Sequence, residues 1–296
     1  MSWKSNDYVV HKNKPDWGVG KVTFANSVEL TVFFVNSGRK VFAQNISLLE
    51  QASDHLCNHP LLNNVAPAAV DGTAKFFPLP DCVQYFLKLF PKGFEDPLYA
   101  SNSATIGERR YKEDARDLAK KLLYRKDWDV FASTGNYSEI CQRLGKIESK
   151  TNLLHSFEKI KWHSALKNTQ LQKLICDSLY EELYGAGTRQ ARFDTWSSTL
   201  GNCEGCAKWT IATYYGFLLH SEERIFIKPE VTKFAAEACG WDLQYDSNLN
   251  WNTLEKAEAL AKYLLDELSR IGLNPRDMID VQSFIWCIDP KSYAEV

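Results

Sequence analysis

The hydrophobic pattern of the chain changes near residue 50. Before it, three short runs rich in β-branched and aromatic residues follow one another, at 20–24, 29–34 and 39–42. Turn-forming residues, Asn26-Ser27 and Asn36-Ser37-Gly38, separate these runs. This alternation of short strands and tight turns predicts a small β-barrel of the five-stranded type over residues 1–50.

Two glycines stand at the entrance of the first long run. Gly18 and Gly20 flank Val19 in the stretch Trp17-Gly-Val-Gly. Because glycine has no Cβ, the backbone can kink there between the entry segment and the strand, where a larger side chain would clash. We expect Trp17 to lie partly exposed at the rim of the barrel, since few apolar neighbours are available to bury its indole completely.

Residues 51–80 read as a linker, and residues 81–296 read as an all-α body. Prolines punctuate the linker, which has room for one short helix. In the body, apolar residues recur at helical spacing. The helices that this pattern predicts lie at 81–90, 108–126, 137–144, 153–166, 171–183, 193–200, 209–219, 229–239, 254–271 and 275–287. Asn252 with Glu255, and Asn274 with Pro275, resemble N-terminal caps of the last two.

Charge and cysteine usage narrow the classes of function. The 296 residues carry a formal net charge of −2, so any contact with DNA must come from a local basic patch. No apolar leader opens the chain and no run of 18 apolar residues is present, which predicts a cytoplasmic protein without a membrane partner. The eight cysteines are mostly single, which favours reduced thiols.

No cofactor or metal is expected from the motifs. The chain has no P-loop, dinucleotide fingerprint, H-E-x-x-H or G-x-S-x-G sequence. Cys203-Glu-Gly-Cys206 is a single C-x-x-C pair, whereas a structural zinc ion needs four ligands. We interpret it as a turn with two free thiols rather than as a zinc site.

The stretch from Tyr8 to Phe42 resembles the Tudor/SH3-like barrels of UvrD/PcrA-type helicases and of CarD-type transcription modules. The resemblance depends on the Trp17-Gly-Val-Gly-Lys-Val segment and on the strands that follow it. It also extends to an uncharacterised bacterial barrel family of the same design. It implies a docking device for nucleic-acid machinery, with RNA polymerase or a helicase as partner. A purely structural barrel is the alternative.

Residues 200–287 resemble, in the order of their parts, the second half of helix-hairpin-helix DNA glycosylases of the endonuclease III type. The turn Gly201-Asn-Cys-Glu-Gly205 stands where those enzymes grip the phosphate backbone, which implies DNA contacts at Gly205 and Lys208. Lys233 falls where the family often has a basic residue. The family's hairpin usually reads Leu-Pro-Gly-Val-Gly, so the acidic Glu204 is a departure.

The segment Ile225-Phe-Ile-Lys228-Pro229-Glu230 occupies the place of the family's catalytic carboxylate. Glu230 could stabilise positive charge on the sugar as a base departs, or Lys228 could attack the sugar carbon as an amine. Alternatively, Glu230 only complements a helix dipole and Lys228 is solvated. Asp280, three residues after Asp277 on one predicted helix, is a third catalytic candidate.

Two further features suggest a DNA surface. The predicted helix 108–126 is rich in basic residues, and Arg109 and Arg110 at its start are candidate phosphate contacts, although a solvated mixed-charge face is equally consistent. Trp241 and Tyr245, in a break between helices, are candidates for a pocket that holds a flipped base. We expect a DNA-binding, glycosylase-like enzyme acting on duplexes with damaged or modified bases. A non-catalytic docking module and a helical protein-interaction scaffold are the alternatives.

Overall fold

The computed structural model describes residues 2–67, 76–103 and 105–293, and these form two compact units. The first comprises Met1–Leu89, Lys233–Leu243 and Cys287–Val296, and the second comprises Phe90–Thr232 and Gln244–Trp286. Two of the boundaries fall inside helices, α10 (Pro229–Cys239) and α12 (Met278–Ile288). No helix in the described part of the chain combines the length and the apolar character that crossing a bilayer requires.

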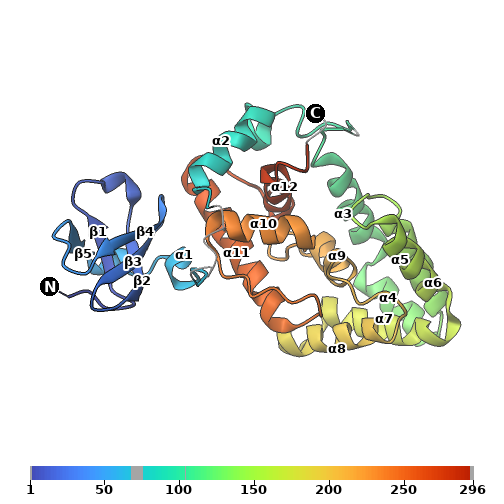
Figure 1. The fold of residues 1–296 in the computed structure, drawn as a ribbon. Helices are drawn as coiled ribbons and strands as arrows, with labels where there is room; N and C mark the ends of the chain where they lie inside the picture. The colour runs from blue at the N-terminus through green and yellow to red at the C-terminus, as the bar shows by residue number, and fades with distance from the viewer. Residues whose placement is uncertain (1, 68–75, 104, 294–296) are drawn as a thin grey trace. The chain divides into compact units, whose positions relative to one another are not determined.

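A curled antiparallel sheet opens the first unit (Figure 1). Its strands are β1 (Tyr8–His11), β2 (Gly20–Ala25), β3 (Glu29–Phe34), β4 (Gly38–Ala43) and β5 (Leu49–Gln51). They pair in the order β4-β3-β2-β1-β5, with a register shift in β2 between Val22 and Phe24. The three predicted runs are therefore strands, and the module is barrel-like as expected.

Alternate residues of the sheet face its concave side and form a small core. Val22, Leu30 and Val32 are completely buried there. The ring of Trp17 packs at the edge of this core, 4.8 Å from the His11 ring and 5.2 Å from the Phe34 ring between centroids. Trp17 remains half-buried, which confirms its expected place at the rim.

The glycines before β2 act as the sequence predicts. Gly18 has a φ of 73°, which side chains rarely adopt. A Cβ on Gly20 would lie 2.7 Å from side-chain atoms of both Val32 and Phe34, so only glycine fits against these core residues. The kink at the start of β2 therefore depends on both positions.

In the remainder of the first unit, residues of the linker contact the chain just after α10. The linker forms α1 (Pro60–Asn63), and α2 (Leu79–Leu89) follows. Val65 makes an isolated bridge with Trp241, and the Ala66 amide donates to the Gly240 carbonyl at 3.0 Å. Trp241 is thereby held in the interior, where 3% of its surface is exposed.

Gly240→Ala is expected to destabilise the first unit by about 2–4 kcal/mol, because it combines a left-handed backbone with overpacking. Gly240 has a φ of 72°, and its Cβ would lie 2.4 Å from Cζ of Phe33. Gly135 has a φ of 71° but nothing within 4 Å of the added atom, so it is the matched control. Urea unfolding of both variants measures the difference. Equal losses of stability in the two variants would show that the contact between the added Cβ and Phe33 does not destabilise the protein.

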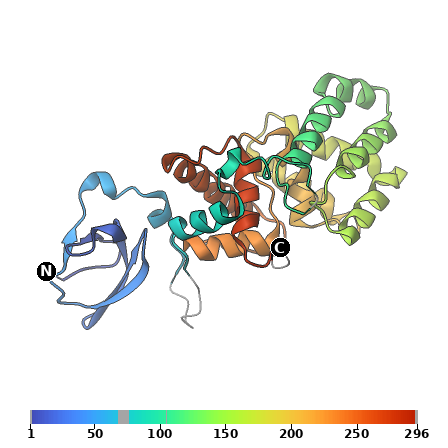
Figure 2. The ribbon, with the colours of Figure 1, turned by 90° about the horizontal axis from the view of Figure 1, so that it is seen from above.

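The second unit is helical. Its helices are α3 (Arg110–Leu122), α4 (Arg125–Ser133), α5 (Tyr137–Glu148), α6 (Ser156–Lys167), α7 (Thr169–Tyr184), α8 (Arg189–Gly201), α9 (Trp209–Leu219) and α11 (Trp251–Arg270), with the first parts of α10 and α12. Every residue of α9 is buried, and α3, α7 and α8 pack around it. Helices α5, α6 and α7, green to yellow in Figure 2, pack against one another.

The fold is mainly helical with a small N-terminal sheet, as expected, but several boundaries differ. The predicted helix 108–126 ends at Leu122, and α4 begins at Arg125. Arg143 donates a hydrogen bond to the Leu122 carbonyl at 2.9 Å, and the Tyr184 hydroxyl donates to the Leu123 carbonyl at 2.6 Å. These side chains satisfy carbonyls at the C-terminus of α3, and the helix ends there.

The predicted caps of the last two long helices are wrong. The amide of Thr253 donates to the side chain of Asn250, so Asn250 rather than Asn252 caps α11. Helix α12 begins at Met278 and not at Pro275. The Asp277 carboxylate accepts from the amide of Ile279 at 3.0 Å and therefore serves as its cap.

Candidate functional site

The segment before α10 is an extended, buried piece of chain. Ile225, Phe226 and Ile227 are each at most 2% exposed. The hydroxyl of Thr213 on α9 accepts from the Ile227 amide at 3.0 Å and donates to the Trp209 carbonyl at 2.7 Å. This bond fixes the segment to the core helix, so the next residue, Lys228, has a defined place just before Pro229.

Lys228 lies against an aromatic ring in a partly dry environment. Its Nζ is 4.0 Å from the centre of the Trp286 ring, and both side chains are half-buried. Burial lowers the pKa of Lys228, and the charge of Lys112 lowers it further, while Glu108 and Glu158 act in the opposite direction. The neutral amine is thus more available here than on a solvated lysine.

Glu158, one of the two carboxylates whose charges act on Lys228, is half-buried. Its Oε1 accepts from the hydroxyl of Thr210, in the first turn of α9, at 2.8 Å. Its Oε2 accepts from the backbone of His155 at 2.8 Å, which completes a capping box at the start of α6. Glu230, in contrast, is exposed in the first turn of α10, where a negative charge favours the helix dipole.

The turn between α8 and α9 is where the sequence places phosphate contacts. Gly205 has a φ of 74°, and Cys203 and Cys206 point inward. The Glu204 side chain is 88% exposed and pairs with Lys161. Lys208 is exposed immediately before α9, whose N-terminus has no side-chain cap. The turn therefore presents an exposed lysine beside the buried start of α9, and Glu204 pairs with Lys161.

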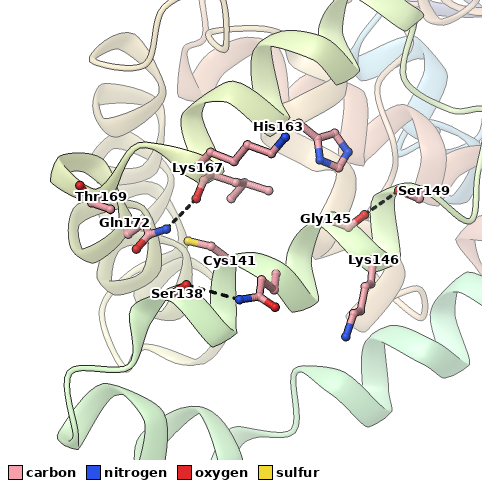
Figure 3. Close-up of a pocket in the computed structure, with 11 residues that line it drawn as sticks. Ser138, Cys141, Gly145, Lys146, Ser149, His163, Lys167, Thr169 and Gln172 are labelled. Atoms are coloured by element: carbon pink, nitrogen blue, oxygen red, sulfur yellow. Dashed lines mark hydrogen bonds between the residues drawn. The ribbon is translucent and has the colours of Figure 1, made fainter.

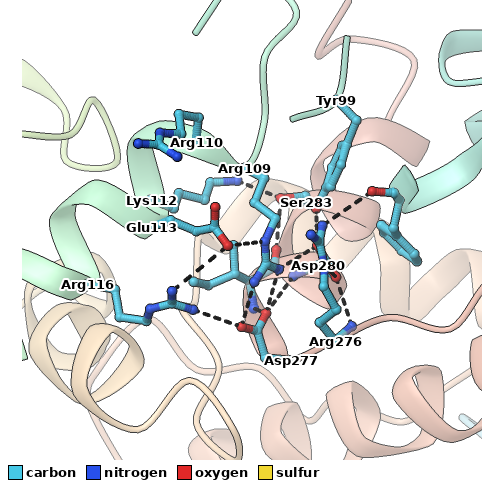
Figure 4. Close-up of polar contacts among 12 residues, drawn as sticks. Tyr99, Arg109, Arg110, Lys112, Glu113, Arg116, Arg276, Asp277, Asp280 and Ser283 are labelled. Atoms are coloured by element: carbon cyan, nitrogen blue, oxygen red, sulfur yellow. Dashed lines mark hydrogen bonds and ion pairs between the residues drawn. The ribbon is translucent and has the colours of Figure 1, made fainter. Parts of the chain in front are cut away.

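A buried ion network occupies the start of α12 (Figure 4). Arg109 donates from Nη1 to Asp280 at 2.7 Å and to Asp277 at 2.8 Å, and from Nε to Glu113 at 2.7 Å. Arg276 donates from Nε to Asp280 at 2.9 Å, and Tyr99 donates to the same carboxylate. Burial opposes ionisation of Asp280, but Arg276, Arg109 and Tyr99 outweigh it and lower its pKa.

This network changes the interpretation of two predicted site residues. Asp280 is completely buried and its oxygens are engaged by two arginines and a tyrosine, a setting that favours a structural role over catalysis. Arg109 is 3% exposed, so a contact with DNA phosphate would require breaking its pairs with carboxylates. Arg110 is exposed but pairs with Asp114 at 3.1 Å. Of the basic residues near α3, Arg109 and Arg116 are therefore counterions for the carboxylates at the start of α12.

The two residues of the predicted base pocket belong to different units. Trp241 is buried in the first unit, and Tyr245 is half-buried in the second. Lys233 is half-buried and belongs to the first unit, whereas Lys228 belongs to the second. The ring of Trp286, one of several aromatic residues that could line a base pocket, instead lies 4.0 Å from the amine of Lys228. Besides burial, the charges of Lys112, Glu108 and Glu158 act on the pKa of Lys228, and no local pattern in the sequence indicates these neighbours.

We expect one thiol to react quickly with Ellman's reagent and seven to react only after unfolding. Cys57 is half-buried, and the seven other cysteines are buried. Burial is the main cause that raises the pKa of Cys82 and of Cys206 to about 12, so little nucleophilic thiolate forms. Cys57→Ser should remove the fast phase. A fast phase from Cys203 or Cys206 would show that the α8–α9 turn is open.

No cluster of three or more metal-ligating side chains occurs among the described residues. Residues 5–51 match the model of a family described as "Protein of unknown function (DUF3553)". This range covers the five strands, which supports a barrel-like module there. No curated protein and no solved structure matches the chain, so the glycosylase resemblance of residues 200–287 has no support from the comparisons.

Proposed function

We propose that the protein binds duplex DNA and removes a damaged or modified base, with Lys228 as the attacking amine. The observation that carries this proposal is the position of Lys228. Its amine is held on the face of Trp286 at the start of a helix, and its pKa is lowered mainly by burial. A lysine whose pKa is lowered in this way suits amine catalysis.

The proposed reaction proceeds through a Schiff base. The neutral amine of Lys228 attacks C1′ of a flipped nucleotide, the bond from C1′ to the base breaks, and the proton released by the amine ends on the departing base. Opening of the sugar ring, with proton transfer to its oxygen, gives an imine between Lys228 and C1′. Water then hydrolyses the imine and restores the free amine. We propose Glu158, whose charge acts on the pKa of Lys228, as the proton carrier.

Phosphate contacts are proposed at the α8–α9 turn. Lys208→Ala should weaken binding to all duplexes alike and lower the slope of log affinity against log salt by about one. The physical reason is that Lys208 is exposed beside the uncapped start of α9. Lys150→Ala, an exposed lysine after α5, is the control. Fluorescence anisotropy over a salt series measures both slopes, and an unchanged slope for Lys208→Ala would contradict the contact.

The N-terminal module is proposed as a Tudor/SH3-like docking device for RNA polymerase or a helicase. The curled five-stranded sheet and the half-buried rim residue Trp17 support this proposal. The ring of Trp17 carries Lys40 Nζ 5.3 Å from its centre, so the rim presents both an aromatic and a positive surface. Such a surface suits a partner of mixed apolar and acidic character.

A second candidate is a non-catalytic module that docks on DNA. The observation that favours it is the placement of the two candidate catalytic carboxylates. Glu230 is exposed at the start of a helix, and Asp280 is engaged in buried ion pairs. Neither is therefore arranged as the charge-stabilising group that a carboxylate mechanism needs. This candidate predicts salt-dependent binding without base release, whereas a pure protein scaffold predicts no binding to DNA.

The deciding experiment uses a panel of duplexes that carry damaged and naturally modified bases. The full-length protein is incubated with each duplex, and abasic sites are detected by alkaline strand cleavage. Release of at least one base, with an unmodified duplex as the control, is the result that we expect. Binding without release from any duplex would support the docking module instead.

A further inference from the structure

Lys112 is a buried lysine in the first turn of α3, and two partners fix its amine. Its side chain is 1% exposed. Its Nζ donates to Oε2 of Glu108 at 3.0 Å and to Oγ of Ser283, on α12, at 2.8 Å. Figure 4 shows Lys112 reaching from α3 toward Ser283. A carboxylate and a hydroxyl that accept from the amine are the kind of partners that a buried ammonium group needs.

Ser283 and Trp286 bring two lysines to one face of α12. The two residues are three apart on the helix, so their side chains lie on the same side of it. Lys112 contacts Ser283, and the Nζ of Lys228 is 4.0 Å from the centre of the Trp286 ring. All four residues belong to the second unit. The two amines therefore approach α12 at neighbouring positions, one from α3 and one from the segment before α10.

The charges around Lys228 come from three elements, and the positive one has the largest effect. Burial is the main cause that lowers the pKa of Lys228, and the charge of Lys112 is the next. Glu108, before α3, and Glu158, on α6, act in the opposite direction, and each has a smaller effect than Lys112. Glu108 and Lys112 together therefore act on Lys228 as a positive group, although they form an ion pair.

We infer that Lys112 acts through Lys228 as a positioning residue: the two form a lysine pair in which the buried, fixed ammonium of Lys112 repels a second positive charge and so favours the neutral amine of Lys228. An adjacent cationic group is one of the means by which proteins activate a lysine nucleophile. The role in base release rests on the proposed function of Lys228, whereas the lysine pair itself can be tested without DNA.

Two exposed lysines of the same unit serve as references. Lys146 on α5 and Lys167 on α6 line a cavity of about 520 Å³ between α5, α6 and α7. Figure 3 shows their amines directed apart, at separate places in the wall. They report on the reagent in the same sample. Lys146→Gln, which removes an exposed and solvent-screened charge, is the matched control for Lys112→Gln.

Competitive acetylation of the full-length protein with acetic anhydride, over a series of pH values, tests the pair. The reagent attacks only neutral amines, so the rate for each lysine, followed by mass spectrometry of its peptide, reports deprotonation. Lys112→Gln should move the midpoint for Lys228 to higher pH and lower its rate at neutral pH by about threefold or more. Lys112→Arg, which keeps the positive charge, and Lys146→Gln should retain the wild-type midpoint.

A double variant keeps the test decisive if Lys112→Gln does not fold. Replacing both members of a buried ion pair by uncharged side chains of similar size is often tolerated, so Glu108→Gln with Lys112→Met removes the pair as a whole. Because the effect of Lys112 exceeds that of Glu108, the midpoint for Lys228 should still move to higher pH. An unchanged midpoint in either folded variant, or an equal shift in Lys112→Arg, would overturn the lysine pair.

Base release separates the lysine pair from the proposed function. In single-turnover release by Lys112→Gln, the limb of the pH profile that rises with deprotonation of the amine should move to higher pH, as the labelling midpoint does. A purely structural role for Lys112 would lower the rate at every pH and leave the limb in place, which would overturn the positioning role. A shifted labelling midpoint in a protein that releases no base would support the pair and contradict the proposed function.

Discussion

Replacing Asp280 with alanine is expected to destabilise the second unit by about 3–5 kcal/mol, the usual cost of removing one partner from a buried ion pair. Asp280 is completely buried, and it accepts hydrogen bonds from Arg109, Arg276 and Tyr99. Without the carboxylate, the buried hydroxyl of Tyr99 loses its acceptor and Arg109 keeps an incompletely compensated charge. Urea unfolding followed by tryptophan fluorescence measures the loss.

The control for Asp280 is a carboxylate on the surface of the same unit. Asp114 is 52% exposed and pairs with Arg110, so Asp114→Ala should change the stability by no more than about 0.5 kcal/mol. If both variants lose the same stability, the buried network does not hold α12 in place. A large loss confined to Asp280→Ala would support the structural role that we assign to it.

The network also predicts a dependence on pH. The pKa of Asp280 is lower in the folded protein than the ordinary carboxyl value, near 3.9. The ionised carboxylate therefore stabilises the folded state fully at pH values above that ordinary value. The contribution is lost as the pH falls through the lowered folded value. Asp280→Asn should therefore reduce the difference in stability between neutral and strongly acidic solution. Asp114→Asn, on the exposed pair, should have little effect on that difference.

Replacing Lys228 with glutamine is expected to abolish base release while DNA binding persists. The amine is the reacting group in our proposal, and glutamine keeps a polar side chain of similar length without a nucleophilic nitrogen. Because the substitution leaves Lys208 at the α8–α9 turn unchanged, the phosphate contact that we propose there should be retained. Single-turnover release and anisotropy, measured on the same duplex, separate the two effects.

Glu230→Gln is the matched variant for Lys228→Gln. Glu230 is exposed in the first turn of α10, so the neutral variant should retain base release. Loss of release in Glu230→Gln with normal release in Lys228→Gln would instead favour the carboxylate mechanism. Normal release in both variants would place the reacting group elsewhere.

Local sequence signals predicted the elements better than the contacts between them. The helices at 209–219 and 229–239 have the predicted bounds. The first is a mostly apolar run and the second begins at Pro229, and both signals act within a few residues. The three long strands and the glycines before β2 were predictable for the same reason, because turn residues and alternating apolar positions define them locally.

The parts that could not be predicted depend on partners distant in the sequence. The basic residues at 108–126 look like a DNA surface in isolation, but Arg109 meets Asp277 and Asp280 only when α3 packs beside α12. The same holds for Lys228: its place before Pro229 can be read from the chain, whereas its ring contact with Trp286 cannot. Trp241 is buried by a bridge to Val65, which no local pattern signals.

Borohydride trapping tests the central claim, that Lys228 attacks the sugar as an amine, most directly. Full-length protein is incubated with a duplex from which it releases a base, sodium borohydride is added, and covalent complexes are separated by denaturing electrophoresis. We predict a trapped protein–DNA adduct with the wild type and with Glu230→Gln, and none with Lys228→Gln. Peptide mapping should place the modification on Lys228. Base release without any adduct, or an adduct that persists in Lys228→Gln, would contradict the account.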